Sequence, residues 1–447
     1  MSFSYNRETN KSIDRILLRG SFVSFVLKIG GVLVAFLLQV ALARLLDPKG
    51  FGDYVFVLTI VNFLVLLASL GLDKAAIKYL PQYLADRSSG LEKAFRSYAD
   101  RLTLSAGAAA SVLLVAVGLL WPGMDGNLRN CLFSGATMII INLFIQLRSS
   151  YFQAIREIAL SSYPQNILRP LALLLLVFVV SLFFQVSAVW AMLASVVSGL
   201  MILVYLHFMA AKKMTGAVPD AEIPNREWLN MAIPMMFISG LNLVMSQADI
   251  FLLGVLQDTT SAGIYSAATK LALLVTFVLT SANVIAAPMI AEFWTKKDMA
   301  AMQHLVSRTS VFSFFLAALI CSSIYIFRDF FLGFYGSGFL IARDALGILL
   351  LSQVVNAAVG CAGYVMIMTG HQRNSLLILV IAAAINLILN VLLIPDLHMR
   401  GAALATFFST LVMCSALAWY TNRIIGINST FVQFQFLMRK KNEGLIG

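Results

Sequence analysis

Two lysines lie inside stretches of the chain that are otherwise apolar. Lys28 lies about nine residues, or roughly 13 Å, into the apolar run that begins near residue 20. Lys270 lies roughly 10 Å into the run 262–289. An ionisable group at such a depth is costly in a bilayer and usually faces the interior of a helix bundle or a water-filled cavity. The two ammonium groups therefore predict a site for an anionic ligand.

The helical face that contains Lys28 is small and polar. We favour a cavity wall on which the lysine meets an anionic group, because its depth in the span makes snorkelling strained; the alternative is a helix-packing seam whose lysine snorkels toward the interface. The same two interpretations apply to Lys270, which shares its face with Ser266. The predicted face of the first run consists of Ser21, Ser24, Lys28, Gly31, Ala35 and Gln39.

Asp249 and Arg148 are two further charges within apolar runs. Asp249 ends a polar stripe with Ser246 and Asn242. It is either a proton or sodium coupling site or a salt-bridge partner of Lys270, and we favour the salt bridge. Arg148 either snorkels or meets the headgroup of an entering lipid substrate.

Other chemistries find little support in the sequence. The four cysteines stand singly in apolar runs, and the four histidines are far apart at the ends of these runs, so we expect no disulfide framework, metal site or cofactor. No Gly-rich phosphate loop followed by Lys-Ser/Thr occurs. The loops between the apolar runs are too short to hold a soluble catalytic domain. We therefore expect a protein that is not an enzyme.

The composition explains where these residues must lie. Hydrophobic residues make up 60% of the 447 positions, charged residues only 12%, and the mean hydropathy is +0.88. Such a chain is an integral membrane protein, because about 20 apolar residues cross a hydrocarbon core of roughly 30 Å. The first run is too long for a signal peptide and lacks a small-residue cleavage site, so we expect it to stay as a span. Twelve spans are predicted: 20–45, 52–72, 102–121, 131–155, 163–184, 188–210, 229–254, 262–289, 308–327, 343–369, 375–394 and 400–423.

The distribution of basic residues orients the spans. Of the 32 Lys and Arg, 24 lie on the face that holds both termini, six lie on the other, and Lys28 and Lys270 lie within the membrane. By the positive-inside rule both termini are cytoplasmic. The net charge of +11 is thus explained by topology, and no nucleic-acid partner is expected. The basic segment 74–101 is predicted to lie on anionic membrane lipids.

An internal repeat divides the chain into halves. A shift of 211 residues places 45–54 over 256–265, with Asp, Gly and Tyr matching at the same offsets. Six spans in each half predict an all-α fold of two pseudo-symmetric lobes facing a central cavity, the architecture of an alternating-access transporter. The expected segments are a cytoplasmic N-terminal segment (1–19), an N-terminal lobe (20–210), a cytoplasmic linker (211–228), a C-terminal lobe (229–424) and a basic cytoplasmic tail (425–447).

Short motifs recur at and beyond these turns. They are ARLLDP (43–48), GFGDY (50–54), GLD (71–73), IKY (77–79), Asn386, Asn390, IP (394–395) and GAA (401–403). With these motifs the sequence resembles, over about residues 10–425, the polysaccharide flippases of the multidrug/oligosaccharidyl-lipid/polysaccharide exporter superfamily. The resemblance implies a V-shaped pair of six-helix bundles that pass a lipid-linked glycan from the cytoplasmic to the outer leaflet, with cavity cations on the first and eighth helices.

We therefore expect a flippase for an undecaprenyl-diphosphate-linked oligosaccharide, an O-antigen or other surface polysaccharide unit, in a bacterial cytoplasmic membrane. Lys28, Lys270, Arg148 and Gln39 are the candidate substrate contacts, and H+ or Na+ is the candidate coupling ion. Membrane lipids and a polysaccharide polymerase are the candidate partners. The alternative is a cation-coupled multidrug exporter that uses Asp249. A membrane-embedded glycosyltransferase would need a large loop with clustered acids, which this chain lacks.

Overall fold

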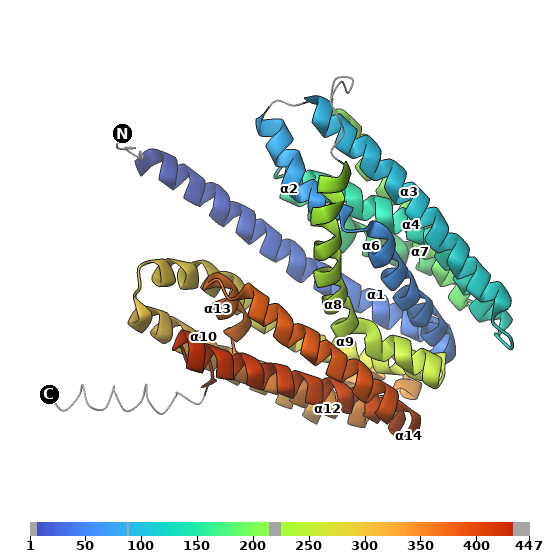
Figure 1. The fold of residues 1–447 in the computed structure, drawn as a ribbon. Helices are drawn as coiled ribbons and strands as arrows, with labels where there is room; N and C mark the ends of the chain where they lie inside the picture. Colours follow the sequence, from blue (N-terminus) through green and yellow to red (C-terminus); the bar gives the residue numbers. More distant parts are fainter. Residues whose placement is uncertain (1–6, 87–88, 214–224, 432–447) are drawn as a thin grey trace. The chain divides into compact units, whose positions relative to one another are not determined.

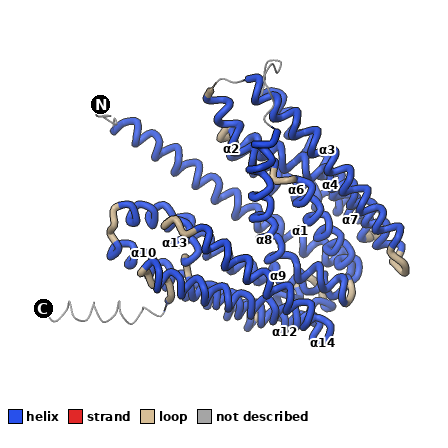
Figure 2. Tube along the Cα trace, in the orientation of Figure 1, coloured by secondary structure: helices blue, strands red, loops and turns tan. Residues whose placement is uncertain are grey.

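The computed structural model describes the backbone of residues 7–86, 89–213 and 225–431. Side chains are described in these ranges apart from residues 7–29 and the positions 89, 213, 225, 278 and 284. All regular elements in the described ranges are helices (Figure 2). A membrane imposes this result, because an apolar run can satisfy its backbone hydrogen bonds within a bilayer only as a helix or a closed barrel. The all-α prediction is confirmed.

The helices follow one another in the order of the predicted spans (Figure 1). Their bounds are α1 (Arg7–Ser69), α2 (Leu72–Ala85), α3 (Ser89–Leu120), α4 (Gly126–Ala154), α5 (Ile158–Tyr163), a π-helical turn η1 (Pro164–Leu168), α6 (Arg169–Phe183), α7 (Ala188–Lys213), α8 (Asn225–Leu256), α9 (Thr259–Thr295), α10 (Met299–Ile326), α11 (Arg328–Gly333), a 3₁₀ turn η2 (Ser337–Ala342), α12 (Arg343–Val359), α13 (Ala362–Met368), α14 (Gln372–Tyr420) and a π-helical turn η3 (Thr421–Ile425).

Ten helices in the described ranges are long and apolar enough to cross a membrane. Two of them contain a residue with positive φ, Asp47 in α1 (φ 58°) and His398 in α14 (φ 52°). Each of these residues separates two predicted spans, so the ten helices account for all twelve. The break at Asp47 precedes Pro48, which cannot donate a backbone hydrogen bond.

The chain divides into two compact units, Met1–Gly240 and Leu241–Gly447. In the first unit α4 is the central helix and packs on α1, α2, α3 and α7. Gly135 of α4 permits this closeness, because a Cβ there would lie only 2.8 Å from Val57 Cγ1 of α1. In the second unit α12 packs between α9, α10 and α14.

Helix α2 shows how the apolar side of the basic segment 74–101 is held. Its apolar face is buried together with Phe95, Tyr151 and Trp228, and the indole Nε1 of Trp228 donates to the Tyr83 hydroxyl at 2.8 Å. The hydrophobic effect therefore fixes this segment against the helix bundle of the first unit. The contact of its basic residues with anionic lipid stays a prediction.

The predicted span 343–369 is also not one helix. It is broken at Gly360 (φ 61°), between α12 and α13. A Cβ at Gly360 would lie 2.1 Å from the Ser310 hydroxyl oxygen of α10, so only glycine permits both the backbone conformation and the close approach.

The internal repeat appears as the same aspartate-to-amide hydrogen bond in both units. Asp47 Oδ1 accepts from the Gly50 amide at 2.7 Å, and Asp258 Oδ1 accepts from the Ser261 amide at 2.7 Å. These pairs correspond under the shift of 211 residues. In the first unit the turn is also tied by Lys49 to Asp125 (2.7 Å), an ion pair that lowers the pKa of the Asp125 carboxyl.

Candidate functional site

Three helices of the second unit converge on the carboxylate of Asp249, which is buried near the end of α8. Its Oδ2 accepts hydrogen bonds from the Tyr265 hydroxyl of α9, at 2.9 Å, and from the Thr406 hydroxyl of α14. Its Oδ1 accepts from Nδ2 of Asn390, also of α14, at 2.7 Å. Asn390 and Thr406 lie on opposite sides of the break at His398, so both halves of α14 reach the carboxylate.

The two asparagines of α14 extend this cluster. Asn386 and Asn390 are fully buried, and Asn390 Nδ2 lies 3.1 Å from Asn386 Oδ1. Asn390 Oδ1 has no hydrogen-bond partner among the described residues. The two ends of an amide are interchangeable by rotation, so Asn390 could turn this oxygen toward Asp249 when a cation is present. The Asp249 cluster, which we define as Asp249, Tyr265, Asn386, Asn390 and Thr406, can therefore offer oxygens to Na+ or hold a proton.

The favoured salt bridge between Asp249 and Lys270 is not present among the described residues. The helix geometry explains why. Tyr265, which binds Asp249, lies five residues before Lys270, and five residues rotate a helix by about 140° beyond a full turn. Lys270 therefore points away from the carboxylate. Its partly buried side chain forms no ion pair in the described part of the chain.

The predicted face of the first span lies in α1. The side chain of Lys28 is outside the described residues. Gly31 of the same face packs against η1, where a Cβ would lie 3.0 Å from both Cβ and the carbonyl oxygen of Asn166. At Gly31, this face of α1 is therefore a seam of helix packing and not an open cavity wall. Gln39, two turns later, has a buried Oε1 with no hydrogen-bond partner among the described residues.

Arg148 is held within the first unit by an acid that the sequence analysis did not pair with it. Its Nη2 lies 2.8 Å from Asp100 Oδ2 of α3, and its guanidinium lies 5.2 Å from the Tyr151 ring centroid. Gln146, two residues earlier, donates instead to Asp73 of α2 at 3.0 Å. The two polar side chains therefore serve different helix contacts, as their opposite directions on α4 predict.

Three buried or partly buried polar side chains were not predicted as site residues from the sequence: Arg169, Tyr265 and Thr406. Arg169 begins α6, and its buried Nη2 has no hydrogen-bond partner in the described ranges. A Cβ at Gly199 of α7 would lie 3.4 Å from this nitrogen. Tyr265 was visible in the sequence as the tyrosine of the repeated turn, whereas Thr406 had no signal.

These features define a multi-pass integral membrane protein whose chemistry lies between its helices. The described residues contain no group of three or more His, Cys, Asp or Glu that could hold a metal ion. They do contain an unpaired ammonium and a buried carboxylate within spans, which mark the paths of ions and substrates in transporters.

Comparisons with known proteins agree with this class. The fold matches an inward-facing multidrug resistance MATE family transporter of the MOP superfamily with a TM-score of 0.72, at 14% identity over 89% of this chain and 95% of that one. It matches the lipid II flippase MurJ with a TM-score of 0.71, at 12% identity over 91% and 87%. An uncharacterized membrane protein of Methanocaldococcus jannaschii is 24% identical over 91% of this chain and 83% of its own length.

Two family models match the sequence. The model described as polysaccharide biosynthesis protein matches residues 17–294, more than half of the chain, and the MatE model matches residues 234–392. The chain belongs to the polysaccharide biosynthesis protein family, and it shares its fold with the MOP superfamily transporter and the lipid II flippase named above.

Proposed function

We propose that the protein is a flippase that moves an undecaprenyl-diphosphate-linked oligosaccharide, an O-antigen or another surface polysaccharide unit, to the outer leaflet by alternating access. The observation that carries the proposal is Lys270, an ammonium within a span that has no ion pair among the described residues. A diphosphate supplies the missing counter-charge. Lys28 is proposed as a second cation and Gln39 as a hydrogen-bonding group for the substrate. Arg148, paired with Asp100, is left with a structural role.

The experiment replaces Lys270 in cells that depend on this protein for surface glycan. Lys270→Gln is expected to reduce export by about tenfold or more, which corresponds to about 1.4 kcal/mol of lost interaction. Lys270→Arg keeps the charge and is expected to retain export. Lys296→Gln, which removes an exposed lysine paired with Glu292, is the matched control. Normal export by Lys270→Gln, with equal protein in the membrane, would contradict the proposal.

We further propose that the Asp249 cluster binds the coupling ion, H+ or Na+. Two hydroxyls and one amide donate hydrogen bonds to a carboxylate that no cation neutralises among the described residues. When a cation binds the carboxylate, the same hydroxyl and amide groups can present their oxygens to it as ligands. Asp249→Asn is expected to abolish the dependence of transport on the ion gradient. Asp396→Asn, an exposed acid of α14, serves as control and should leave that dependence unchanged.

A cation-coupled multidrug exporter is the second candidate. It is favoured by the MatE match over 234–392, which includes the buried acid Asp249. Expression would then lower the accumulation of ethidium in cells, and Asp249→Asn would restore it. The flippase proposal includes two further points. The protein lies in a bacterial cytoplasmic membrane with both chain termini in the cytoplasm, and it associates with a polysaccharide polymerase. Accessibility labelling of the termini and co-purification test these two points.

A further inference from the structure

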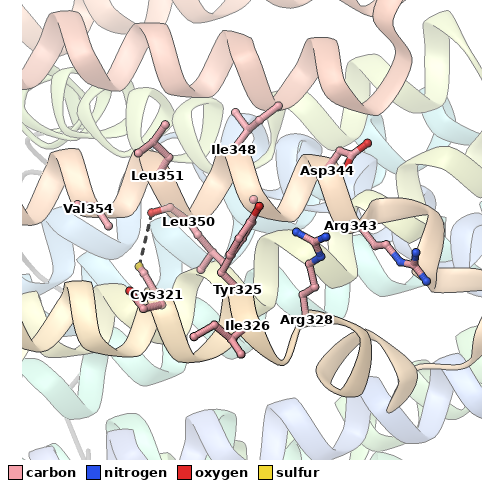
Figure 3. Close-up of a pocket in the computed structure, with 12 residues that line it drawn as sticks. Cys321, Tyr325, Ile326, Arg328, Arg343, Asp344, Ile348, Leu350, Leu351 and Val354 are labelled. Carbon is pink, nitrogen blue, oxygen red and sulfur yellow. Dashed lines mark hydrogen bonds between the residues drawn. The ribbon is translucent and has the colours of Figure 1, made fainter.

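A groove in the second unit lies between α10 and α12 (Figure 3) and encloses about 680 Å³. Most of its wall is apolar. The charged groups, Arg328, Arg343 and Asp344, gather at one end, where α10 finishes and α12 begins, as the labelled side chains in Figure 3 show. The lining residues are Cys321, Ser322, Tyr325, Ile326, Arg328, Arg343, Asp344, Gly347, Ile348, Leu350, Leu351 and Val354.

The polar end of the groove carries one uncompensated positive charge. The Arg328 guanidinium lies 4.7 Å from the Tyr325 ring centroid and forms no ion pair among the described residues. The neighbouring acids are already neutralised. Asp329 pairs with Nε of Arg343 at 2.8 Å, and Asp344 pairs with Arg400. Stacking on Tyr325 therefore fixes a free guanidinium at the mouth of an apolar groove.

The dimensions of the groove match one leaflet of a bilayer. From Arg343 to Val354 the helix rises about 16 Å, at 1.5 Å per residue. This is close to half of a hydrocarbon core of roughly 30 Å, which is the depth that one acyl chain occupies. The groove is open at its side, because Ile326 and Leu351 of its wall are 72% and 52% exposed. Its charged end lies at the ends of two spans, where lipid headgroups lie.

We propose that this groove binds one anionic glycerophospholipid of the surrounding bilayer. The phosphodiester lies at Arg328, with Arg343 beside it, and one acyl chain lies along Ile348, Leu351 and Val354. The charges favour a phospholipid over an isoprenoid diphosphate, because a single unpaired guanidinium complements a monoanion. The proposal is independent of the transported substrate and requires only that the protein resides in a membrane.

Native mass spectrometry of the full-length protein tests the proposal. The detergent-purified protein is offered equimolar phosphatidylglycerol and phosphatidylcholine with identical acyl chains. The wild type is expected to retain one phosphatidylglycerol preferentially. Arg328→Gln is expected to lower the ratio of bound phosphatidylglycerol to phosphatidylcholine about fivefold, the effect of one basic residue near an anionic headgroup. Arg373→Gln, which removes an exposed arginine of the same unit outside the groove lining, is the control and should keep the ratio of the wild type.

A second pair of variants tests the acyl chain. Leu351→Trp fills the groove and is expected to remove the retained lipid of either kind. Leu319→Trp enlarges another exposed leucine, on α10 outside the lining, and should keep it. An unchanged lipid ratio in Arg328→Gln, or retention of lipid by Leu351→Trp, would overturn the proposal. Displacement of phosphatidylglycerol by a lower concentration of polyprenyl phosphate would also overturn it and would assign the groove to an isoprenoid carrier.

Discussion

Replacing Arg148 with glutamine tests whether this arginine supports the helix bundle or contacts the substrate. The guanidinium is held by Asp100 at 2.8 Å and by the faces of Tyr151 and Phe144, at 5.2 and 5.9 Å from their ring centroids. Arg148 joins α4 to α3 within the first unit. If this is its role, the variant loses stability and keeps transport activity per folded molecule.

The size of the loss follows from the burial of the pair. Breaking a buried ion pair by removing one partner costs about 3–5 kcal/mol, because the other charge is left uncompensated. Here the Arg148 side chain is 10% exposed and that of Asp100 is 33% exposed. The Nε of Arg148 also has no hydrogen-bond partner in the described ranges, so the pair rests on a single hydrogen bond. Because the Asp100 side chain is partly exposed, water can reach the acid that remains, and we expect a loss of about 2–3 kcal/mol in the free energy of unfolding.

A double-mutant cycle in detergent measures this energy. Unfolding free energies are compared for the wild type, Arg148→Gln, Asp100→Asn and the double variant. The sum of the two single losses is expected to exceed the loss measured for the double variant by about 1–2 kcal/mol. A coupling energy near zero would show that the pair does not stabilise the fold. A double variant of normal stability that no longer exports glycan would instead return Arg148 to the substrate path.

Two further predictions concern backbone positions that the fold requires. Gly360→Ala is expected to lower the free energy of unfolding by about 3 kcal/mol or to prevent folding, because its Cβ would overlap Ser310 and the φ of residue 360 is 61°. Gly363→Ala is the control and should be tolerated, because no atom lies within 4 Å of the added Cβ. Size-exclusion elution of a fluorescent fusion compares the two. Asp47→Ala and Asp258→Ala are each expected to lose about 1 kcal/mol of unfolding free energy, because each cap accepts one backbone amide. Thermal unfolding measures this, and a large loss in one variant alone would contradict equivalent caps.

The spans were predictable because each needs only a local run of apolar residues. The repeat was predictable for a similar reason, since Asp47 and Asp258 cap their helices through residues three positions away. The break at Gly360 was not predictable, because the chain remains apolar on both sides and the cause is Ser310, fifty residues earlier. A hydropathy pattern contains no information about such an approach.

The candidate site shows the same division. The sequence identified Lys270, Asp249 and Arg148, because a charge in an apolar run is conspicuous wherever the run folds. It could not assign their partners. The sequence favoured a salt bridge between Asp249 and Lys270. In the structure the Asp249 carboxylate instead accepts hydrogen bonds from Tyr265, Asn390 and Thr406, the last of which lies 157 residues away in the chain.

The amino-acid sequence by itself determined that this protein is a helical membrane protein, where its spans lie and which charges the membrane must accommodate, because transfer of a side chain into a bilayer depends mainly on local composition. Only the tertiary structure decided which charges are neutralised. A hydrogen bond or an ion pair acts over about 3 Å and depends on the direction in which each helix faces. That direction is set by packing between helices distant in the sequence, which buried Asp249 among hydroxyl and amide donors and left Lys270 without an ion pair among the described residues.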